Sequence, residues 1–375
     1  MPRFATPILS LDVTTYTLRT DAPWVHGDGT AGRQRTILVY VEVVAGGHTG
    51  IGYTYADEAT AHFIANDLAP VVVGRDAMSI SECFEKMTAA ARPLGLAGIA
   101  ANAISAIDIA LWDLKARILD VPLVTLLGAA RTAVPVYGSG GLTSYPIPRL
   151  LDQLGQWVSQ GMQAVKMKVG VDPASDLIRV RAVRDLIGPE PQLFVDGGGA
   201  GSAKRALAQA ERFAELDVSW FEEPVPSDDL DGLRLLRERA PATMEIGSGQ
   251  MGHEPVYFNR MLAAGAVDVL SADVTRCGGI TGFLRVAALC EAHHIPLSAH
   301  GAPAITLHVA CAVPRLRHIE YAHEHVRLEH RMFEGIPEPE GGMLRPDLSR
   351  PGLGLTLKSA GDATEISPDA AYGDH

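Results

Sequence analysis

Lys166 and Lys168 stand two residues apart within residues 164–170, a stretch of strand-forming side chains. Residues two apart in a strand point to the same face, so the two ammonium groups are predicted to lie side by side on one wall. Two like charges on a buried wall are costly unless an opposite charge faces them. The pair therefore indicates a site that binds an anion or takes up a proton.

Polar side chains recur where the neighbouring strand-like segments end. They are Asp196, Glu222, Glu223, Gln250, Asp273, His300 and Glu320. A single one of these residues would be ordinary as a cap or a surface charge. The same kind of ending at successive strands favours a catalytic site instead.

The donor types in this set predict metal-assisted acid/base chemistry. Asp196 and Glu222 offer the carboxylate oxygens that suit Mg²⁺. Mg²⁺ and ammonium groups together would hold a substrate carboxylate and stabilise the enediolate that forms when the α-proton leaves. A neighbouring cation lowers the pKa of a lysine, so Lys168 is expected to act as a base near neutral pH.

A second acid/base group is predicted from Asp273 and His300, since a carboxylate fixes the tautomer and orientation of an imidazole. Glu320 would donate a hydrogen bond if it is protonated. These residues alone do not decide between dehydration, racemisation and another elimination. A carboxylate-binding protein without activity is the alternative from another class, and the intact lysine and Asp–His pairs argue against it.

The segments that must position these groups alternate between strand and helix from residue 134 onward. Strands are predicted at residues 134–137, 164–169, 193–196, 218–222, 244–246, 267–270, 295–298 and 319–321. Helical patterns separate them at 150–160, 174–187, 203–216, 230–239, 254–263, 283–292 and 304–313. These repeats predict an α/β fold of the (β/α)8 TIM-barrel type, whose chemistry sits at the carboxyl ends of the strands. A doubly wound open sheet competes, and the even spacing disfavours it.

The first third of the chain has the pattern of an α+β domain, with strands before helices. Strands are predicted at 8–19, 36–44 and 50–55, with a hairpin turn at 45–48, and helices at 59–68, 79–91 and 99–119. The last helix is expected to carry Asp108, Asp113 and Lys115 on its surface. Residues 1–130 are predicted to form a capping domain joined by the C-terminal segment 345–375, and residues 131–344 the catalytic barrel.

The strand-end set resembles the enolase superfamily, and within it the mandelate racemase-like group. The resemblance covers nearly the whole chain and rests on Lys166-Met167-Lys168, Asp196, Trp220-Phe221-Glu222-Glu223-Pro224, Asp273-Val274-Thr275-Arg276-Cys277-Gly278-Gly279, Ser298-Ala299-His300 and Glu320. It implies that Lys168 is a base assisted by Lys166, and that Asp273 and His300 form a dyad on the opposite face. It also implies that Glu320 hydrogen-bonds the substrate carboxylate, and that Asp196 and Glu222 bind the metal.

The resemblance also implies that a capping-domain loop sets specificity, which makes Trp24 and His26 candidates for substrate binding. Two positions depart from the pattern. Gln250 stands where a third acidic metal ligand is usual, and Gly198 replaces an Asn. A Gln carbonyl can ligate Mg²⁺ but adds no charge, so weaker metal binding is expected. Glu245, five residues earlier on the same strand, is expected to lie too far from the mouth to replace the missing acid and to point to the other face of the strand.

The function predicted from this resemblance is a carbon–oxygen lyase that dehydrates a sugar acid through a Mg²⁺-stabilised enediolate. A racemase or epimerase, or a different carboxylate lyase on the same scaffold, is the alternative within the superfamily. Family members are usually symmetric oligomers, so a homo-oligomer is predicted.

Bulk properties exclude several other functions. The net charge is −12 and basic runs are absent, which disfavours nucleic acid and anionic membranes as partners. No apolar run approaches the ~18 residues of a bilayer span. The four scattered cysteines and an N-terminus without a secretory pattern predict a cytoplasmic protein.

Two local motifs are set aside. The glycine-rich run at 197–202 does not fit the dinucleotide-binding pattern and follows the wrong strand. His323-Glu324-His325 lacks the spacing that places two imidazoles one helical turn apart.

Overall fold

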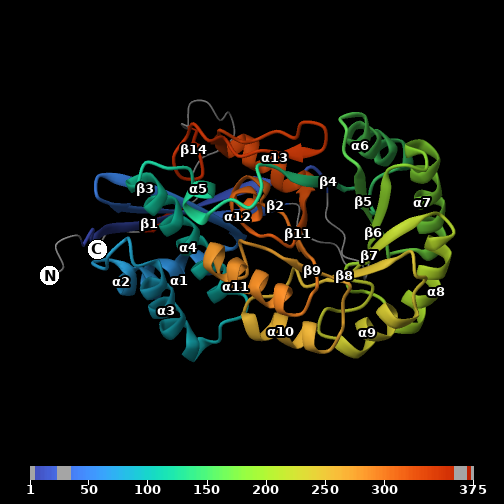
Figure 1. Cartoon of the computed structure of the whole chain (residues 1–375), viewed down its shortest axis with the longest axis horizontal. Coiled ribbons are helices and arrows are strands. Elements are labelled where there is room, and N and C mark those ends of the chain that lie inside the picture. The colour runs from blue at the N-terminus through green and yellow to red at the C-terminus, as the bar shows by residue number, and fades with distance from the viewer. Residues whose placement is uncertain (1–4, 23–34, 359–369, 373–375) are drawn as a thin grey trace.

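Parallel strands close into a barrel in the computed structural model, which describes residues 5–22, 35–358 and 370–372 (Figure 1). The barrel strands are β4 (Val134–Gly140), β5 (Ala164–Lys168), β6 (Gln192–Asp196), β7 (Val218–Glu222), β8 (Glu245–Ser248), β9 (Val269–Ala272), β10 (Leu297–Ala299) and β11 (Leu316–Ala322). Each strand pairs with the next, and β11 pairs back with β4. The predicted (β/α)8 barrel is confirmed, and the open sheet is not what forms.

Helices follow the strands and cover the barrel. They are α6 (Ile147–Ser159), α7 (Pro173–Ile187), α8 (Ala203–Ala214), α9 (Leu230–Arg239), α10 (Pro255–Ala263), α11 (Gly279–Ala292), α12 (Pro303–Ala312) and α13 (His323–Met332). The sequence did not predict α13, because charged residues and histidines dominate it. Its buried face consists of Leu328, Glu329 and Met332.

β4 is longer than predicted and extends beyond Tyr137 to Gly140. A Cβ atom at Gly138 would lie 2.4 Å from the Trp157 ring, and one at Gly140 would lie 2.2 Å from Gln153 Oε1. The two glycines thus let α6 lie directly on the strand. As a consequence Ser139 is a strand residue, and it is buried.

The N-terminal part forms an antiparallel sheet in the order β15-β1-β2-β3. Its strands are β1 (Ile8–Arg19), β2 (Arg35–Ala45), β3 (His48–Ala56) and β15 (Ala370–Tyr372). Gly46 and Gly47 connect β2 to β3 with φ values of 59° and 79°, the left-handed conformation that a two-residue hairpin turn requires. The predicted hairpin is confirmed.

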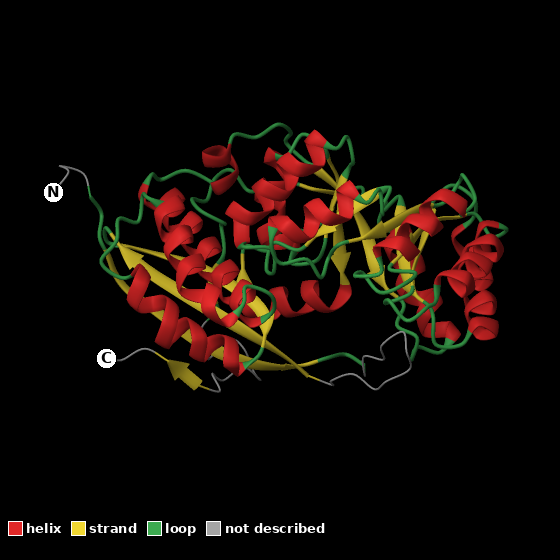
Figure 2. Ribbon diagram, turned by 90° about the horizontal axis from the view of Figure 1, so that it is seen from below, coloured by secondary structure: helices red, strands yellow, loops and turns green. Residues whose placement is uncertain are grey.

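Helices pack on one face of this sheet (Figure 2). They are α1 (Glu58–Phe63), a π-helical turn (Ile64–Leu68), α2 (Ala69–Val72), α3 (Ile80–Ala91), a 3-10 turn (Arg92–Leu94), α4 (Ile99–Ile118) and α5 (Leu123–Leu127). A Cβ atom at Gly50 would lie 2.3 Å from the Ala110 carbonyl oxygen, and one at Gly52 would lie 2.2 Å from that of Ala106. Glycine in β3 therefore allows α4 to contact the strand backbone.

The prediction that α4 carries Asp108 and Asp113 on its surface is wrong, since both are fully buried. Asp108 Oδ1 accepts a hydrogen bond of 2.9 Å from the Thr281 backbone N–H at the start of α11. Asp113 accepts from the N–H groups of Ile51 at 2.8 Å and Leu353 at 2.6 Å. α4 has neighbours on both sides, so its carboxylates satisfy the backbone of other segments.

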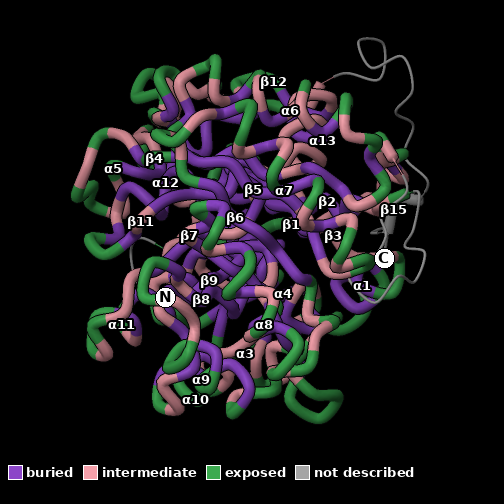
Figure 3. The backbone as a smooth tube through the Cα atoms, turned by 90° about the vertical axis from the view of Figure 1, so that its right-hand side faces the viewer, coloured by how far each residue is buried: buried purple, intermediate pink, exposed green. Residues whose placement is uncertain are grey.

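The C-terminal segment pairs with both parts of the chain. β14 (Thr356–Leu357) pairs with β12 (Phe333–Glu334), β13 (Met343–Leu344) pairs with β4, and β15 pairs with β1. Buried residues concentrate in the barrel strands and against the capping sheet (Figure 3). The boundaries predicted at residues 130 and 345 remain predictions.

All four cysteines are buried free thiols, as predicted. Among the described helices, none combines the length and apolarity that a bilayer crossing needs.

Candidate active site

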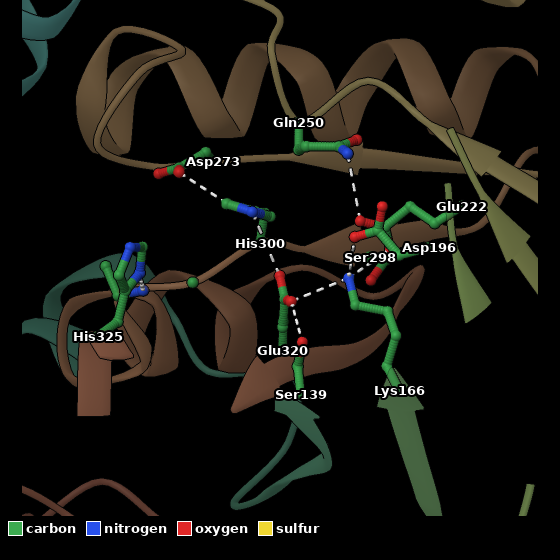
Figure 4. Close-up of polar contacts among 12 residues, drawn as sticks. Ser139, Lys166, Asp196, Glu222, Gln250, Asp273, Ser298, His300, Glu320 and His325 are labelled. Carbon is green, nitrogen blue, oxygen red and sulfur yellow. Dashed lines mark hydrogen bonds and ion pairs between the residues drawn. The ribbon is translucent and has the colours of Figure 1, made fainter. Parts of the chain in front are cut away.

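Lys166 lies in a buried ionic cluster at the carboxyl ends of the barrel strands (Figure 4). Its Nζ is 2.6 Å from Glu222 Oε2, 2.9 Å from Glu320 Oε1 and 3.5 Å from Asp196 Oδ2. Burial opposes the charged form, but Glu222 and the other carboxylates raise the pKa of Lys166 well above its usual value. Lys166 therefore holds a fixed positive charge inside the mouth.

Lys168 follows on the same wall, as the strand period predicts, and pairs with Asp196. Burial, and then Lys166, lower the pKa of Lys168, but Asp196 and Glu222 together outweigh them, so that the net shift is upward. The sequence predicted a downward shift from neighbouring cations. The direction differs because the nearest charged group is a carboxylate. Despite burial, the two lysines lower the pKa of Asp196 to about 2.

Gln250 follows β8 and is buried against Glu222. Its Nε2 donates to Glu222 Oε1 at 3.2 Å, while its Oε1 has no hydrogen-bond partner within the described ranges. A buried acceptor without a partner is costly. Two carboxylates and this amide oxygen are hard donors of the kind that Mg²⁺ prefers, so the residues present fit a divalent cation beside Asp196 and Glu222.

The two other positions weighed for the metal shell behave differently. The Gly198 backbone N–H donates to Asp196 Oδ1 at 2.9 Å, which orients that carboxylate. Glu245 begins β8 and pairs at 2.6 Å with Arg317 near the start of β11. Glu245 thus belongs to the opposite end of the barrel, in agreement with the sequence prediction.

Asp273 and His300 form a hydrogen-bonded pair, with Nδ1 and Oδ2 separated by 2.8 Å. Asp273 Oδ1 accepts from the Thr275 backbone N–H at 2.8 Å and from its hydroxyl at 2.7 Å. The Thr275 carbonyl in turn accepts from the Thr54 hydroxyl of β3 at 2.8 Å. Burial opposes ionisation, but Arg276 and His300 keep the pKa of Asp273 low. The capping sheet therefore helps to anchor the dyad.

Glu320 lies between the dyad and the lysines. Its Oε2 is 3.4 Å from His300 Nε2, and its Oε1 accepts from the Ser139 hydroxyl at 2.5 Å. Burial opposes ionisation, yet Lys166 and His300 lower the pKa of Glu320. Glu320 is thus a hydrogen-bond acceptor in this arrangement, where the sequence had suggested a protonated donor. Against burial, Glu320 and Asp273 raise the pKa of His300.

The predicted strand-end groups meet at one end of the barrel. They are Lys166, Lys168, Asp196, Glu222, Gln250, Asp273, His300 and Glu320. The proposed substrate contacts Trp24 and His26 lie outside the described residues.

Sequence reasoning missed Ser139 and His325. Ser139 was lost because the predicted strand stopped before Gly138, and extending the strand-end rule by two residues would have found it. His325 lies in the unpredicted helix α13 and packs beside His300, with the ring centroids 6.1 Å apart. A histidine a few residues after the last barrel strand was the available signal.

His323 and Glu324 both contact Asp21, whereas His325 has a different partner. His323 Nε2 lies 3.0 Å from Asp21 Oδ2, and Glu324 Oε1 accepts from the Asp21 backbone N–H at 3.0 Å. The guanidinium of Arg149 also pairs with the Asp21 carboxylate. His325 instead accepts from the backbone of the loop after His300. The two imidazoles do not share a site, as their spacing predicted.

Family models match both parts of the chain. The mandelate racemase / muconate lactonizing enzyme N-terminal domain matches residues 10–128. The enolase C-terminal domain-like model matches residues 149–361.

Two relatives resemble the chain over most of their length. A 3,6-anhydro-alpha-L-galactonate cycloisomerase from Streptomyces coelicolor is 36% identical over 83% of this chain and 86% of its own. An L-talarate/galactarate dehydratase from Salmonella typhimurium is 32% identical over 87% of this chain and 83% of its own.

Solved structures share the fold. A mandelate racemase/muconate lactonizing enzyme-like protein from Rubrobacter xylanophilus is 48% identical, with a TM-score of 0.92 over 96% of this chain and 99% of its own. A racemase from Streptomyces coelicolor with bound magnesium is 31% identical, with a TM-score of 0.87 over 93% of this chain and 97% of its own.

Proposed function

The chain is an enzyme of the mandelate racemase-like group of the enolase superfamily, and on that premise we propose that it removes the proton α to a carboxylate and eliminates water from a sugar acid. The observation that carries the proposal is the position of Glu320. It contacts Lys166 at 2.9 Å and His300 at 3.4 Å, so the lysine wall and the dyad border one space. Two proton-transfer groups can then act on one small molecule.

Lys168 and His300 divide the proton transfers in this proposal. One of them takes the α-proton and the other protonates the leaving hydroxyl. The raised pKa of His300 suits the acid, because Asp273 and Glu320 outweigh burial and favour the imidazolium. Lys168 then acts as the base once it is released from Asp196. Lys166 keeps its charge and holds the substrate carboxylate.

Asp196, Glu222 and Gln250 are the proposed ligands of Mg²⁺. An ion held by these residues would supply positive charge that stabilises the substrate carboxylate and the enediolate, and Asp196, as one of its ligands, would no longer need Lys168 as its partner. Gln250 contributes its unpaired Oε1 to this shell. Trp24 and His26 remain predicted substrate contacts, and the cytoplasmic location and homo-oligomeric state also remain predictions.

Incubation with a panel of sugar acids in D₂O tests the proposal. Deuterium at the α-carbon and a dehydrated keto acid product are expected for at least one acid. Exchange without loss of water would favour a racemase or epimerase on the same scaffold. No exchange into any carboxylate would leave the non-catalytic binding protein as the better description.

A further inference from the structure

His325 lies at the mouth of the barrel but has no part in the proposed proton transfers. Its ring is perpendicular to that of His300, at 89°, with the centroids 6.1 Å apart. In Figure 4 it stands on the side of His300 away from Lys166. Two groups at this separation can contact different carbons of one bound molecule, so the position of its N–H donor matters.

The tautomer of His325 is fixed by its surroundings. The Ala302 backbone N–H donates to His325 Nδ1 at 3.0 Å. A peptide N–H only donates, so Nδ1 must accept and the neutral ring carries its hydrogen on Nε2. Burial, and then the neighbouring His300, lower the pKa of His325 to about 4, so the ring is neutral near pH 7. His325 therefore offers one N–H donor, at Nε2.

The loop after His300 is shaped around this ring. Gly301 and Ala302 have φ values of 55° and 41°, a region that is unfavourable for alanine. A Cβ atom at Gly301 would lie 2.3 Å from His325 Nδ1. The left-handed backbone brings the Ala302 N–H onto the ring and leaves no room for a side chain before it. The orientation of the imidazole is therefore determined by the backbone.

The capping sheet holds the other face of the ring. Tyr55 of β3 stacks on His325 with the centroids 4.1 Å apart and the planes 15° from parallel. The ring is thus clamped between Tyr55 and the loop at 301–302, while the residue as a whole stays only partly buried. A donor with fixed position and tautomer is the kind of group that recognises an oxygen atom on a ligand.

The geometry points to His325 as a specificity residue whose Nε2–H donates a hydrogen bond to an oxygen of the substrate beyond its reacting carbons. This inference rests on the proposed function and narrows it to acids that carry a hydroxyl or a second carboxylate on their distal carbons. An acid without such an oxygen leaves the Nε2–H unpaired and binds less well.

Two substitutions separate this role from a purely structural one. His325→Asn keeps an acceptor near the position of Nδ1 for the Ala302 N–H but removes the Nε2 donor. His325→Gln keeps an N–H near the position of Nε2 but loses that acceptor. The probes are six-carbon aldonates of each configuration, each paired with its analogue that lacks the hydroxyls of the three carbons furthest from the carboxylate. Calorimetry measures binding to the full chain with and without added Mg²⁺.

The wild type and His325→Gln are expected to prefer at least one aldonate over its deoxy analogue by about tenfold, the worth of one well-made hydrogen bond. His325→Asn should lose the preference, with unchanged affinity for the analogue. Where turnover occurs, KM should change and kcat should not.

A wild type without any preference, or a His325→Asn variant that retains it, overturns the inference. An equal loss of affinity for both members of every pair also overturns it, since that is the mark of a structural role. Nitrogen-15 spectra that place the hydrogen on Nδ1 would do the same. These readouts need no turnover, whereas absence of α-proton exchange in the wild type contradicts the proposed function itself.

Discussion

The two sides of the barrel mouth hold their charged groups in different ways. On the side of β5 to β8, Lys166 and Lys168 pair with Asp196 and Glu222, so each charge is balanced by another charge. On the side of β9 to β11, Arg276 and His300 lie beside Asp273, and neutral donors add hydrogen bonds that orient the groups. Asp273 receives the Thr275 N–H and hydroxyl, and His325 receives the Ala302 N–H.

The difference indicates what each side can do. Ion pairs can exchange partners when a substrate carboxylate or a cation arrives, because the incoming charge replaces the one that is released. Neutral hydrogen bonds from the backbone keep their geometry whatever is bound. The β5–β8 side is therefore suited to binding charge, and the β9–β11 side to presenting proton donors in fixed directions.

The largest effect is expected on the reaction itself, where both sides should matter equally. Lys168→Ala and His300→Ala should each lower α-proton exchange in D₂O by about 10²–10⁴-fold, the usual contribution of a positioned acid or base. The exposed Lys204 and His48 provide matched control variants with alanine. Wild-type exchange in both active-site variants would contradict the mechanism.

Stability should distinguish the two sides. Lys166→Met removes the shared counter-charge of Glu222 and Glu320, and breaking such a buried pair is expected to lower the free energy of unfolding by about 3–5 kcal/mol. His300→Ala should cost much less, because its ring is partly exposed. Urea unfolding measures both. Equal losses of the free energy of unfolding would mean that the ionic cluster contributes no more to stability than the dyad does.

The pH dependence of stability tests the β9–β11 side. Burial raises the pKa of Glu329 to about 8, while its Oε1 accepts from the Tyr53 hydroxyl at 2.6 Å. Because the pKa of Glu329 is raised, the folded state keeps its proton at pH values where the unfolded state has lost it. The stability contributed by the protonated carboxyl is therefore complete below the ordinary pKa of a glutamate and is lost as the pH rises through about 8.

Glu329→Gln cannot lose that proton. Between pH 5 and 8 the wild type should therefore lose up to about 1.4 kcal/mol per pH unit relative to the variant. Urea unfolding across this range measures the difference, and parallel pH profiles would refute the assignment.

The smallest effect is expected at the metal shell. Gln250→Glu adds a charge next to Glu222, so Mg²⁺ should bind about tenfold tighter or more, which corresponds to about 1.4 kcal/mol. Without Mg²⁺ the same variant should be less stable, because two carboxylates then face each other. Titration calorimetry and thermal unfolding measure the two effects. Unchanged affinity would remove Gln250 from the shell.

The strand-end residues were predictable because a parallel barrel brings the carboxyl ends of all its strands to one rim. Locating the strands in the sequence was therefore enough to predict which residues meet, without knowing their contacts. Ser139 was missed because the predicted strand ended at Tyr137, although the strand continues through Gly138, which admits Trp157. Asp108 was misplaced because a helix pattern does not reveal that a second layer covers its polar face.

The ionisation of the site was less predictable than its composition. The sequence placed Lys168 beside Lys166, which suggested a lowered pKa, but it did not show which charge lies nearest. The raised pKa of Lys168 follows from contact with Asp196 across the neighbouring strand. Distances between side chains on adjacent strands decide such shifts, and periodicity alone does not supply them.

The hydrogen bond from Thr54 to the carbonyl of Thr275 limits how this enzyme can be recombined. It joins the antiparallel sheet to Thr275, the residue whose backbone N–H and hydroxyl hold the carboxylate of the dyad. A chimera that takes its N-terminal third from a relative would also need a matching hydroxyl at that point of contact. Exchanging the N-terminal part between homologues is therefore more restricted than its distinct fold suggests.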